Sequence, residues 1–158
     1  MARLTKQFES ATVEWNTPDS IYDPLNKEFG FNLDVCATSE NTKCGRFYTK
    51  EDNGLLQSWF GICWMNPPYG RELAKWIYKA AKEQKNGVTT VALIPARTNT
   101  GWWHDIIMPK AEIRFIRGRP KFGNAKEGLP WPMAVVVFYG NKRIINEEEE
   151  IENDRGKK

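Results

Sequence analysis

Two continuous apolar runs constrain the fold of this chain most strongly. The segments "VTTVALIPA" (88–96) and "MAVVVFYG" (133–140) are almost wholly apolar and do not alternate between polar and apolar residues. A strand that is apolar on both sides must be covered on both faces of its sheet. The two runs therefore predict a mainly parallel α/β sandwich, with helices on both faces of one sheet.

The remaining segments alternate in the way that such a sandwich requires. Apolar residues recur at helical spacing over 71–87, and a shorter helix is expected over 99–111, closed by Pro109. An earlier helical pattern contains Pro24, which predicts a split or a kink there. Further strands are expected at 31–37, 60–65 and 111–118, with "RFYT" (46–49) as a candidate sixth strand.

The length and composition suit one compact domain. The chain has 158 residues, of which 41% are hydrophobic, enough for a single core. We expect one domain over 1–146 and a charged tail over 147–158. The sequence contains no apolar stretch of membrane-spanning length, and its first ten residues lack the apolar run of a signal peptide. A cytoplasmic protein without a membrane partner is expected.

Cysteine and histidine usage argues against a metal site. Cys36, Cys44 and Cys63 form no CxxC pair, and His104 is the single histidine. Neither a zinc site nor a disulfide framework is therefore expected. For His104 a place at the surface or at a helix end is favoured over catalysis.

Charge is distributed unevenly along the chain. The tail has six acids and three bases, which leaves residues 1–146 with 20 bases against 14 acids. Six bases and one acid fall between Lys110 and Lys126, interleaved with Phe115 and Phe122. This run indicates phosphate contacts, but a solvated surface hairpin explains it equally well. The candidates for contact with nucleic acid are Arg97, Thr98, Trp102, Arg117, Arg119 and Lys121, with core packing favoured for Trp102.

The segment "WMNPPYG" (64–70) follows an expected strand, at the edge where α/β sheets bind ligands. Its two prolines cannot continue the strand, and they restrict the neighbouring backbone. Asn66 offers a side-chain carbonyl, Pro67 a backbone carbonyl and Tyr69 a flat face. Two acceptors beside an aromatic ring suit a planar amino group, although an Asn-Pro-Pro turn can also be purely structural.

Asn66-Pro67-Pro68-Tyr69 matches the [D/N]-P-P-[Y/F/W] motif of S-adenosylmethionine-dependent amino methyltransferases. With "EWNTPDSIYDPLNKEFGFNLDVCA", "DNGLLQSW", "ALIPARTNTGWW" and "IRGRPKF" in this order, the chain resembles the phage-type DNA N6-adenine methyltransferases, the phage Dam-like family, from about Glu14 to Tyr139. The resemblance implies a Rossmann-like methyltransferase sandwich whose C-terminal strand is antiparallel. It also implies S-adenosylmethionine as cofactor, duplex DNA with a flipped adenine as partner, and a phage- or prophage-encoded protein in a bacterial host.

The resemblance assigns roles to the motif. Asn66 and the Pro67 carbonyl accept hydrogen bonds from the adenine amino group, and Tyr69 stacks on the extruded base. Pro68 completes the catalytic turn. No covalent enzyme intermediate is needed, and none of the three cysteines follows a proline, as the nucleophile of a cytosine C5 enzyme usually does.

Cofactor residues are also implied by the resemblance. Thr17 and Pro18 resemble the segment at the methionine end of the cofactor, and Asp52 the acid that reads its adenine amine. Asp34, with Cys36 and Ala37, follows the first strand, but the usual glycines are missing there. The alternatives are a helix N-cap for Thr17-Pro18, a strand-end cap for Asp34 and a turn residue for Asp52.

Two other functions stay open beside DNA adenine N6-methylation. One is the same chemistry on cytosine N4, RNA adenine or a protein amide. The other is a nucleic-acid-binding protein that kept the fold and lost the cofactor. A hairpin is expected between "IRGRPKFGN" and "PWPMAVVVF", and no other segment is long enough for a separate recognition domain. Modest sequence discrimination is therefore expected.

Overall fold

The computed structural model describes residues 16–123 and 127–140. The acidic tail, Trp15 and Lys126 lie outside these residues, and the expected division at residue 146 stays a prediction.

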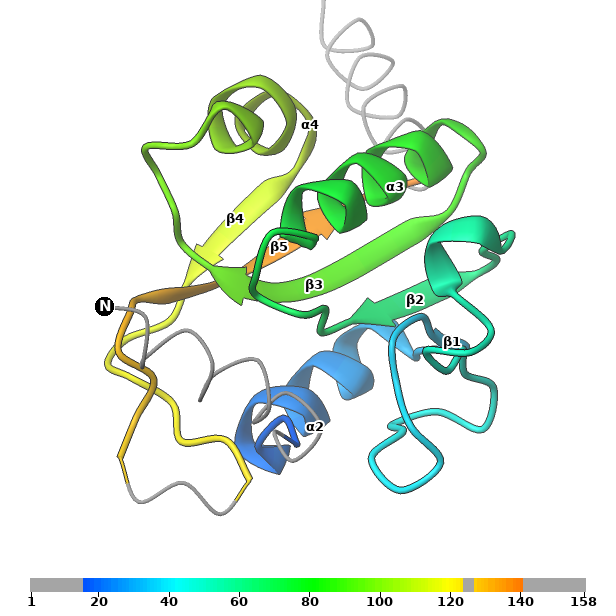
Figure 1. Ribbon diagram of the computed structural model, residues 1–158, viewed down its shortest axis with the longest axis horizontal. Coiled ribbons are helices and arrows are strands. Elements are labelled where there is room, and N and C mark those ends of the chain that lie inside the picture. The colour runs from blue at the N-terminus through cyan, green and yellow to red at the C-terminus, as the bar shows by residue number, and fades with distance from the viewer. Residues whose placement is uncertain (1–15, 124–126, 141–158) are drawn as a thin grey trace, which may run out of the picture.

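A five-stranded sheet in the order β1-β2-β3-β5-β4 forms the centre of the molecule (Figure 1). β1, β2 and β3 are parallel, whereas β5 is antiparallel to both β3 and β4. Four strands therefore run in one direction and the C-terminal strand runs in the other, which confirms the expected topology. The strands are β1 (Leu33–Asp34), β2 (Ile62–Met65), β3 (Thr89–Pro95), β4 (Glu112–Phe115) and β5 (Met133–Phe138).

The first strand is much shorter than the predicted 31–37. Beyond Asp34 the chain turns back, because the Asp34 carboxylate accepts hydrogen bonds from the backbone N–H groups of Cys36 and Lys43. The candidate sixth strand at 46–49 is reduced to one bridge, between Asp34 and Phe47. Side-chain hydrogen bonds of this kind compete with strand ladders, which apolar patterning does not reveal.

Helices cover the sheet on both faces, as predicted from its apolar strands. α3 (Leu73–Lys85), which lies in front of β3 and β5 in Figure 1, packs on one face together with η2 (Trp103–Ile107), which α4 (Met108–Lys110) continues. α2 (Asp19–Phe29) packs on the other. Ala92 and Ile94 belong to the α3 side of the core, whereas Val91 and Leu93 belong to the α2 side. The alternation of β3 side chains thus supplies two cores at once.

Two predictions about helix breaks can be compared with the structure. Of the split or kink predicted at Pro24, the split is wrong: α2 continues through Pro24, because Tyr22 and Leu25 on either side of it are both buried in the core. The kink stays a prediction. The predicted stop at Pro109 is confirmed within one residue, since α4 ends at Lys110. Pro109 stands one residue before the end of a helical stretch that runs without a break over 101–110.

The short 3-10 helix η1 (Gly54–Leu56) completes the elements. No helix in the described residues is long and apolar enough to cross a membrane. Within those residues no three metal-ligating side chains gather, and the three cysteines are unbridged.

Candidate active site

The topology brings the motif segments to one edge of the sheet. β1, β2 and β3 all end at this edge, β5 begins there opposite Pro95, and β4 ends there opposite Ala134. The turns after Asp34, Met65 and Pro95 therefore meet the segment that joins β4 to β5. Ligands of α/β sheets bind outside this edge.

The Asn66 side chain is held by two hydroxyl groups. Its Nδ2 donates to Oγ1 of Thr17 at 2.9 Å, across 49 positions in sequence. Its Oδ1 accepts a hydrogen bond from the Tyr69 hydroxyl. Asn66 is half-buried, whereas Thr17 is 5% exposed. The structure therefore joins the candidate catalytic turn directly to a candidate cofactor segment.

The two prolines hold the turn after Asn66. Pro67 is buried and Pro68 is half-buried. Among the described residues, no hydrogen-bond donor reaches the Pro67 carbonyl. The Pro67 carbonyl therefore keeps its lone pairs for another donor, and its predicted role as a second acceptor beside Asn66 stays a prediction.

Tyr69 is more enclosed than a surface stacking platform. Its side chain is 8% exposed, and its ring meets that of Phe122 edge-on at a centroid distance of 6.5 Å. Burial raises the pKa of the Tyr69 hydroxyl well above its ordinary value, so this group remains a donor to Asn66. The Tyr69 carbonyl accepts a hydrogen bond from Nη2 of Arg97 at 2.7 Å. Arg97, expected at a phosphate, is therefore also an anchor of the turn.

Asp34 lies at the end of β1 and is 3% exposed. Its two oxygens accept backbone hydrogen bonds from Cys36 at 3.3 Å and from Lys43 at 3.1 Å. Burial outweighs these bonds and raises the pKa of Asp34 to about 6. Burial, reinforced by the charge of Asp34, also raises the pKa of the Cys36 thiol to about 12. Cys36 is therefore a protonated thiol, which agrees with a mechanism that needs no cysteine nucleophile.

The other cofactor candidates take local roles in the structure. Ala37 is buried, and its N–H donates to the carbonyl of Tyr48. Asp52 is exposed and accepts hydrogen bonds from the backbone and hydroxyl of Thr49, which lower the pKa of its carboxyl. Asp52 therefore has the turn geometry that was the alternative to its contact with the cofactor adenine.

The helix N-cap that was the alternative for Thr17-Pro18 is displaced by one residue in the structure. The cap of α2 is Pro18, and no side chain caps this end of the helix. The Thr17 hydroxyl faces Asn66 instead. Pro18 still fixes the local backbone, because its carbonyl accepts from the N–H groups of Ile21 and Tyr22.

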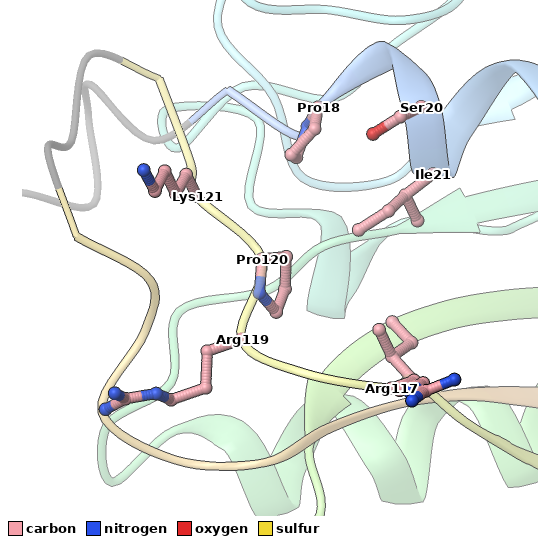
Figure 2. A pocket seen from close by; sticks show the side chains of 8 residues that line it. Pro18, Ser20, Ile21, Arg117, Arg119, Pro120 and Lys121 are labelled. Atoms are coloured by element: carbon pink, nitrogen blue, oxygen red, sulfur yellow. The ribbon is translucent and has the colours of Figure 1, made fainter.

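The basic segment after β4 borders this edge. Arg117, Arg119 and Lys121 are exposed and help to line an open pocket of ≈ 360 Å³ against Pro18, Ser20 and Ile21 at the start of α2 (Figure 2). In Figure 2 the side chains of Arg117 and Arg119 point in opposite directions. The three cations are thus spread over a basic surface and do not converge on a single phosphate.

Another base of the same run is already paired. Arg114 donates two hydrogen bonds to Glu28, at 2.6 and 2.8 Å, and a further one to Glu112. These bonds join β4 to α2. The basic run therefore divides into a structural part before Phe115 and an exposed part after it.

The segment after β3 carries the other candidates for contact with DNA. Thr98 is exposed, and its carbonyl is 2.6 Å from Nε2 of His104, which is also exposed. Trp102 is half-buried, with its ring 6.1 Å from that of the buried Trp103. Trp103 belongs to the core, and the surface position expected for His104 is confirmed.

Sequence reasoning missed the contribution of Phe122, which is 1% exposed in the α2-side core. Its segment is tied down by backbone hydrogen bonds from Gly123 to Asn16 and from Leu129 to Pro120. The second bond supports the predicted hairpin. The interleaving of Phe122 with bases suggested exposure, and no local signal distinguishes it from Phe115, which is 68% exposed.

Comparison with known proteins gives the family. The family model for DNA N-6-adenine-methyltransferase (Dam) matches residues 5–143. The chain belongs to this family. Its relatives include the DNA N-6-adenine-methyltransferase of Haemophilus phage HP1, 33% identical over 118 residues that cover 72% of this chain and 68% of that protein. The enzyme of the same name from Escherichia phage T1 is 33% identical over 106 residues, 65% of this chain and 44% of that protein.

A third relative, the putative methyltransferase YfdM of Escherichia coli, is 41% identical over 64 residues, 35% of this chain and 70% of that protein. The chain spans about two thirds of the HP1 relative and less than half of the T1 relative. Membership of the Dam family confirms the resemblance and the methyltransferase-type fold. It makes the chain a DNA N6-adenine methyltransferase, in a family that uses S-adenosylmethionine and acts on DNA.

Proposed function

We propose that this Dam-family enzyme methylates adenine at the turn formed by Asn66, Pro67, Pro68 and Tyr69. The observation that carries the proposal is the orientation of Asn66, whose amide is held between the hydroxyl groups of Thr17 and Tyr69 at the carboxyl edge of the sheet. A purely structural turn would not need an amide fixed in this way beside a proline carbonyl that no donor of the described residues reaches.

The two acceptors can activate an adenine amino group. The Oδ1 atom of Asn66 has two lone pairs, and the Tyr69 hydroxyl occupies one of them. The second lone pair and the Pro67 carbonyl accept the two N6 hydrogens, so that the N6 lone pair is drawn out of conjugation and aimed. As the bond between N6 and the methyl carbon forms, the bond between that carbon and the sulfonium sulfur of S-adenosylmethionine would break, and its electrons would stay on the sulfur. N6 then loses a proton to water.

The target adenine must leave the duplex to reach this turn. Pro67 is buried and Asn66 is half-buried, so a stacked base cannot present its amino group to both acceptors. We propose a flipped adenine that stacks on Tyr69. Because Phe122 already contacts the Tyr69 ring, the base uses the remaining side of the ring or displaces Phe122.

The residues near the end of β1 fit S-adenosylmethionine by their chemistry. When bound, it supplies an electrophilic methyl group on a sulfonium. Each oxygen of Asp34 retains a lone pair beside its backbone hydrogen bond, which suits an ammonium or a ribose hydroxyl. We assign Asp34, Cys36 and Ala37 to this contact, with Thr17–Pro18 at the methionine end and Asp52 at the adenine end.

The proposed partner surface combines Arg97, Thr98 and Trp102 with the exposed bases Arg117, Arg119 and Lys121. All follow strands that end at the same edge as the turn. Two of the relatives are phage proteins, which supports a phage- or prophage-encoded enzyme acting in the cytoplasm of a bacterial host.

The test is transfer of a labelled methyl group from S-adenosylmethionine to unmethylated duplex DNA, with nucleoside analysis of the product. We expect N6-methyladenine from the wild type and at least about a hundredfold less from Asn66→Ala and from Tyr69→Ala. Thr90→Val is the control, because Thr90 is fully buried in β3 and its hydroxyl has no partner among the described residues.

Other products would contradict the proposal. N4-methylcytosine, or transfer to RNA or protein in place of DNA, would assign the turn to a different amino group. Full activity in both variants would remove the turn from the chemistry. Absence of both transfer and cofactor binding in the wild type would favour a nucleic-acid-binding protein on this fold.

A further inference from the structure

We propose that Thr17 is a positioning residue for the catalytic amide: its hydroxyl holds Asn66 so that Oδ1 faces the target amino group. This inference rests on the proposed function of the turn. It leaves the cofactor contact proposed above to Pro18 and to the backbone of Thr17, because it commits the Thr17 hydroxyl to the acceptor amide rather than to the methyl donor.

The hydroxyl of Thr17 is committed to Asn66 by its surroundings. The side chain is 5% exposed, and its Oγ1 lies 2.9 Å from Nδ2 of Asn66. Threonine at the start of a helix commonly caps it, but no side chain caps α2. The local backbone hydrogen bonds of this end are made by the Pro18 carbonyl. The Thr17 hydroxyl is therefore left for the amide.

The support behind Thr17 is rigid. Pro18 fixes the backbone immediately after it, and α2 is anchored through the buried Tyr22 and Leu25. On the other side, Asn16 accepts a backbone hydrogen bond from Gly123. The hydrogen bond to Thr17 thus fixes the Asn66 amide, which belongs to the turn after β2, relative to α2.

An amide needs such support more than a carboxylate does. The terminal torsion of asparagine is soft, and a half-turn replaces the acceptor Oδ1 by the donor Nδ2. A donor facing the adenine amino group would repel it. Hydrogen bonds at both ends of the amide hinder this rotation, because a half-turn must break both of them, whereas the Tyr69 hydroxyl alone holds only one end.

The first experiment compares Thr17→Val, which removes the hydroxyl at nearly constant volume, with Thr17→Ser, which keeps it. We expect Thr17→Val to lower kcat about tenfold with the Kd for S-adenosylmethionine changed less than about twofold, and Thr17→Ser to recover most of the activity. Thr90→Val, which removes a buried hydroxyl that has no partner among the described residues, is the matched control and keeps wild-type kcat. Calorimetry gives the Kd, and thermal melting shows that each variant is folded.

The second experiment uses Asn66→Asp, which the family motif allows. A carboxylate presents an oxygen in either orientation, so adding Thr17→Val to the Asn66→Asp variant should cost less than about threefold in kcat. A general packing defect would cost the same in the wild type and in the Asn66→Asp variant. This difference is the readout that a merely structural role of Thr17 would not produce.

A third readout does not depend on activity. In the wild type the side-chain amide protons of Asn66, assigned by their loss in Asn66→Asp, should exchange slowly with water and should exchange faster in Thr17→Val. Unchanged exchange, or an unchanged kcat in Thr17→Val, would overturn the inference. A weakened cofactor Kd with kcat intact would return Thr17 to the cofactor. An inactive wild type with protected amide protons would instead overturn the proposed function and leave the Thr17–Asn66 link supported.

Discussion

At the scale of single residues, buried and half-buried polar groups at the edge of the sheet form hydrogen bonds with one another and with the backbone. Asn66 connects Thr17 to Tyr69, and Arg97 holds the carbonyl of Tyr69. Asp34 closes the loop that follows β1 through two backbone N–H groups. Because a buried polar group without a partner is costly, each of these contacts constrains the backbone that carries it.

Asp34 makes stability depend on pH in an unusual direction. Its pKa is raised to about 6 in the fold from 3.8, so between these values the folded form holds a proton that the unfolded chain has lost. The free energy of unfolding therefore falls as pH rises through this window, by on the order of 1 kcal/mol between pH 5 and pH 7.5. Urea denaturation at the two pH values should show this fall in the wild type and its loss in Asp34→Asn.

Glu40→Gln is the control for this prediction. Glu40 is fully exposed, and a hydrogen bond from Ser39 lowers the pKa of its carboxyl. Its contribution is lost only as pH falls below its ordinary pKa of 4.5, so the variant should keep the wild-type difference between pH 5 and pH 7.5. If Asp34→Asn kept the same difference, the buried carboxyl would not be its source.

At the scale of elements, two helices on opposite faces fix the sheet and the site together. α2 supports Thr17 and is joined to β4 through the Glu28–Arg114 pair. α3 follows the Asn66–Tyr69 turn and packs through Trp76, Ile77 and Ala80 on the other face. The turn therefore lies between a strand and a helix that are both anchored in the core.

α2 carries a local defect that can be removed. Pro24 is exposed in the interior of the helix, where proline cannot donate to the carbonyl four residues before it. Pro24→Ala should raise the free energy of unfolding by about 2 kcal/mol, the helix penalty of proline less its restriction of the unfolded chain. Urea denaturation of Pro24→Ala beside Lys27→Ala, an exposed change in the same helix, measures it. A loss of stability would show that Pro24 is required by its surroundings.

At the scale of the whole molecule, exposed basic residues and the Asn66–Tyr69 turn lie at the same edge of the sheet. The segment with Arg117, Arg119 and Lys121 follows β4 and lies against the start of α2, next to Thr17. The ends of α2 and α3 lead to the opposite edge, from which β1 and β3 begin. A duplex that presents an adenine to Asn66 thus approaches the basic segment and not the far edge.

This arrangement predicts the salt dependence of DNA binding. Replacing Arg117, Arg119 and Lys121 together by alanine should weaken binding and reduce the slope of log K against log[salt] by up to about 2.7, since each phosphate contact contributes about 0.9. Fluorescence anisotropy over a series of salt concentrations gives the slope. Alanine at Lys27, Lys82 and Lys85, three exposed bases near the opposite edge, makes the same change in net charge and should leave the slope nearly unchanged. Equal effects of the two triple variants would show that only net charge matters.

Sequence patterning was sufficient for what depends on neighbours along the chain. The apolar runs at 88–96 and 133–140 predicted strands buried on both faces, and β3 and β5 are buried throughout. The spacing over 71–87 predicted α3, and the residue types of Asn66-Pro67-Pro68-Tyr69 predicted two acceptors beside a ring. These features follow from local propensity and periodicity, which each segment carries by itself.

Tertiary structure decided which side chains meet. The bond from Asn66 to Thr17 spans 49 residues, Tyr69 is enclosed by Phe122, and Arg114 is paired with Glu28 across 86 residues. Burial of Tyr22 and Leu25 against the sheet carried α2 through Pro24, which local propensity alone would have broken. The sequence by itself therefore determined the elements and the chemical groups of the site. Only the packed fold decided their partners, because hydrogen bonds and burial depend on distances in space that no local pattern records.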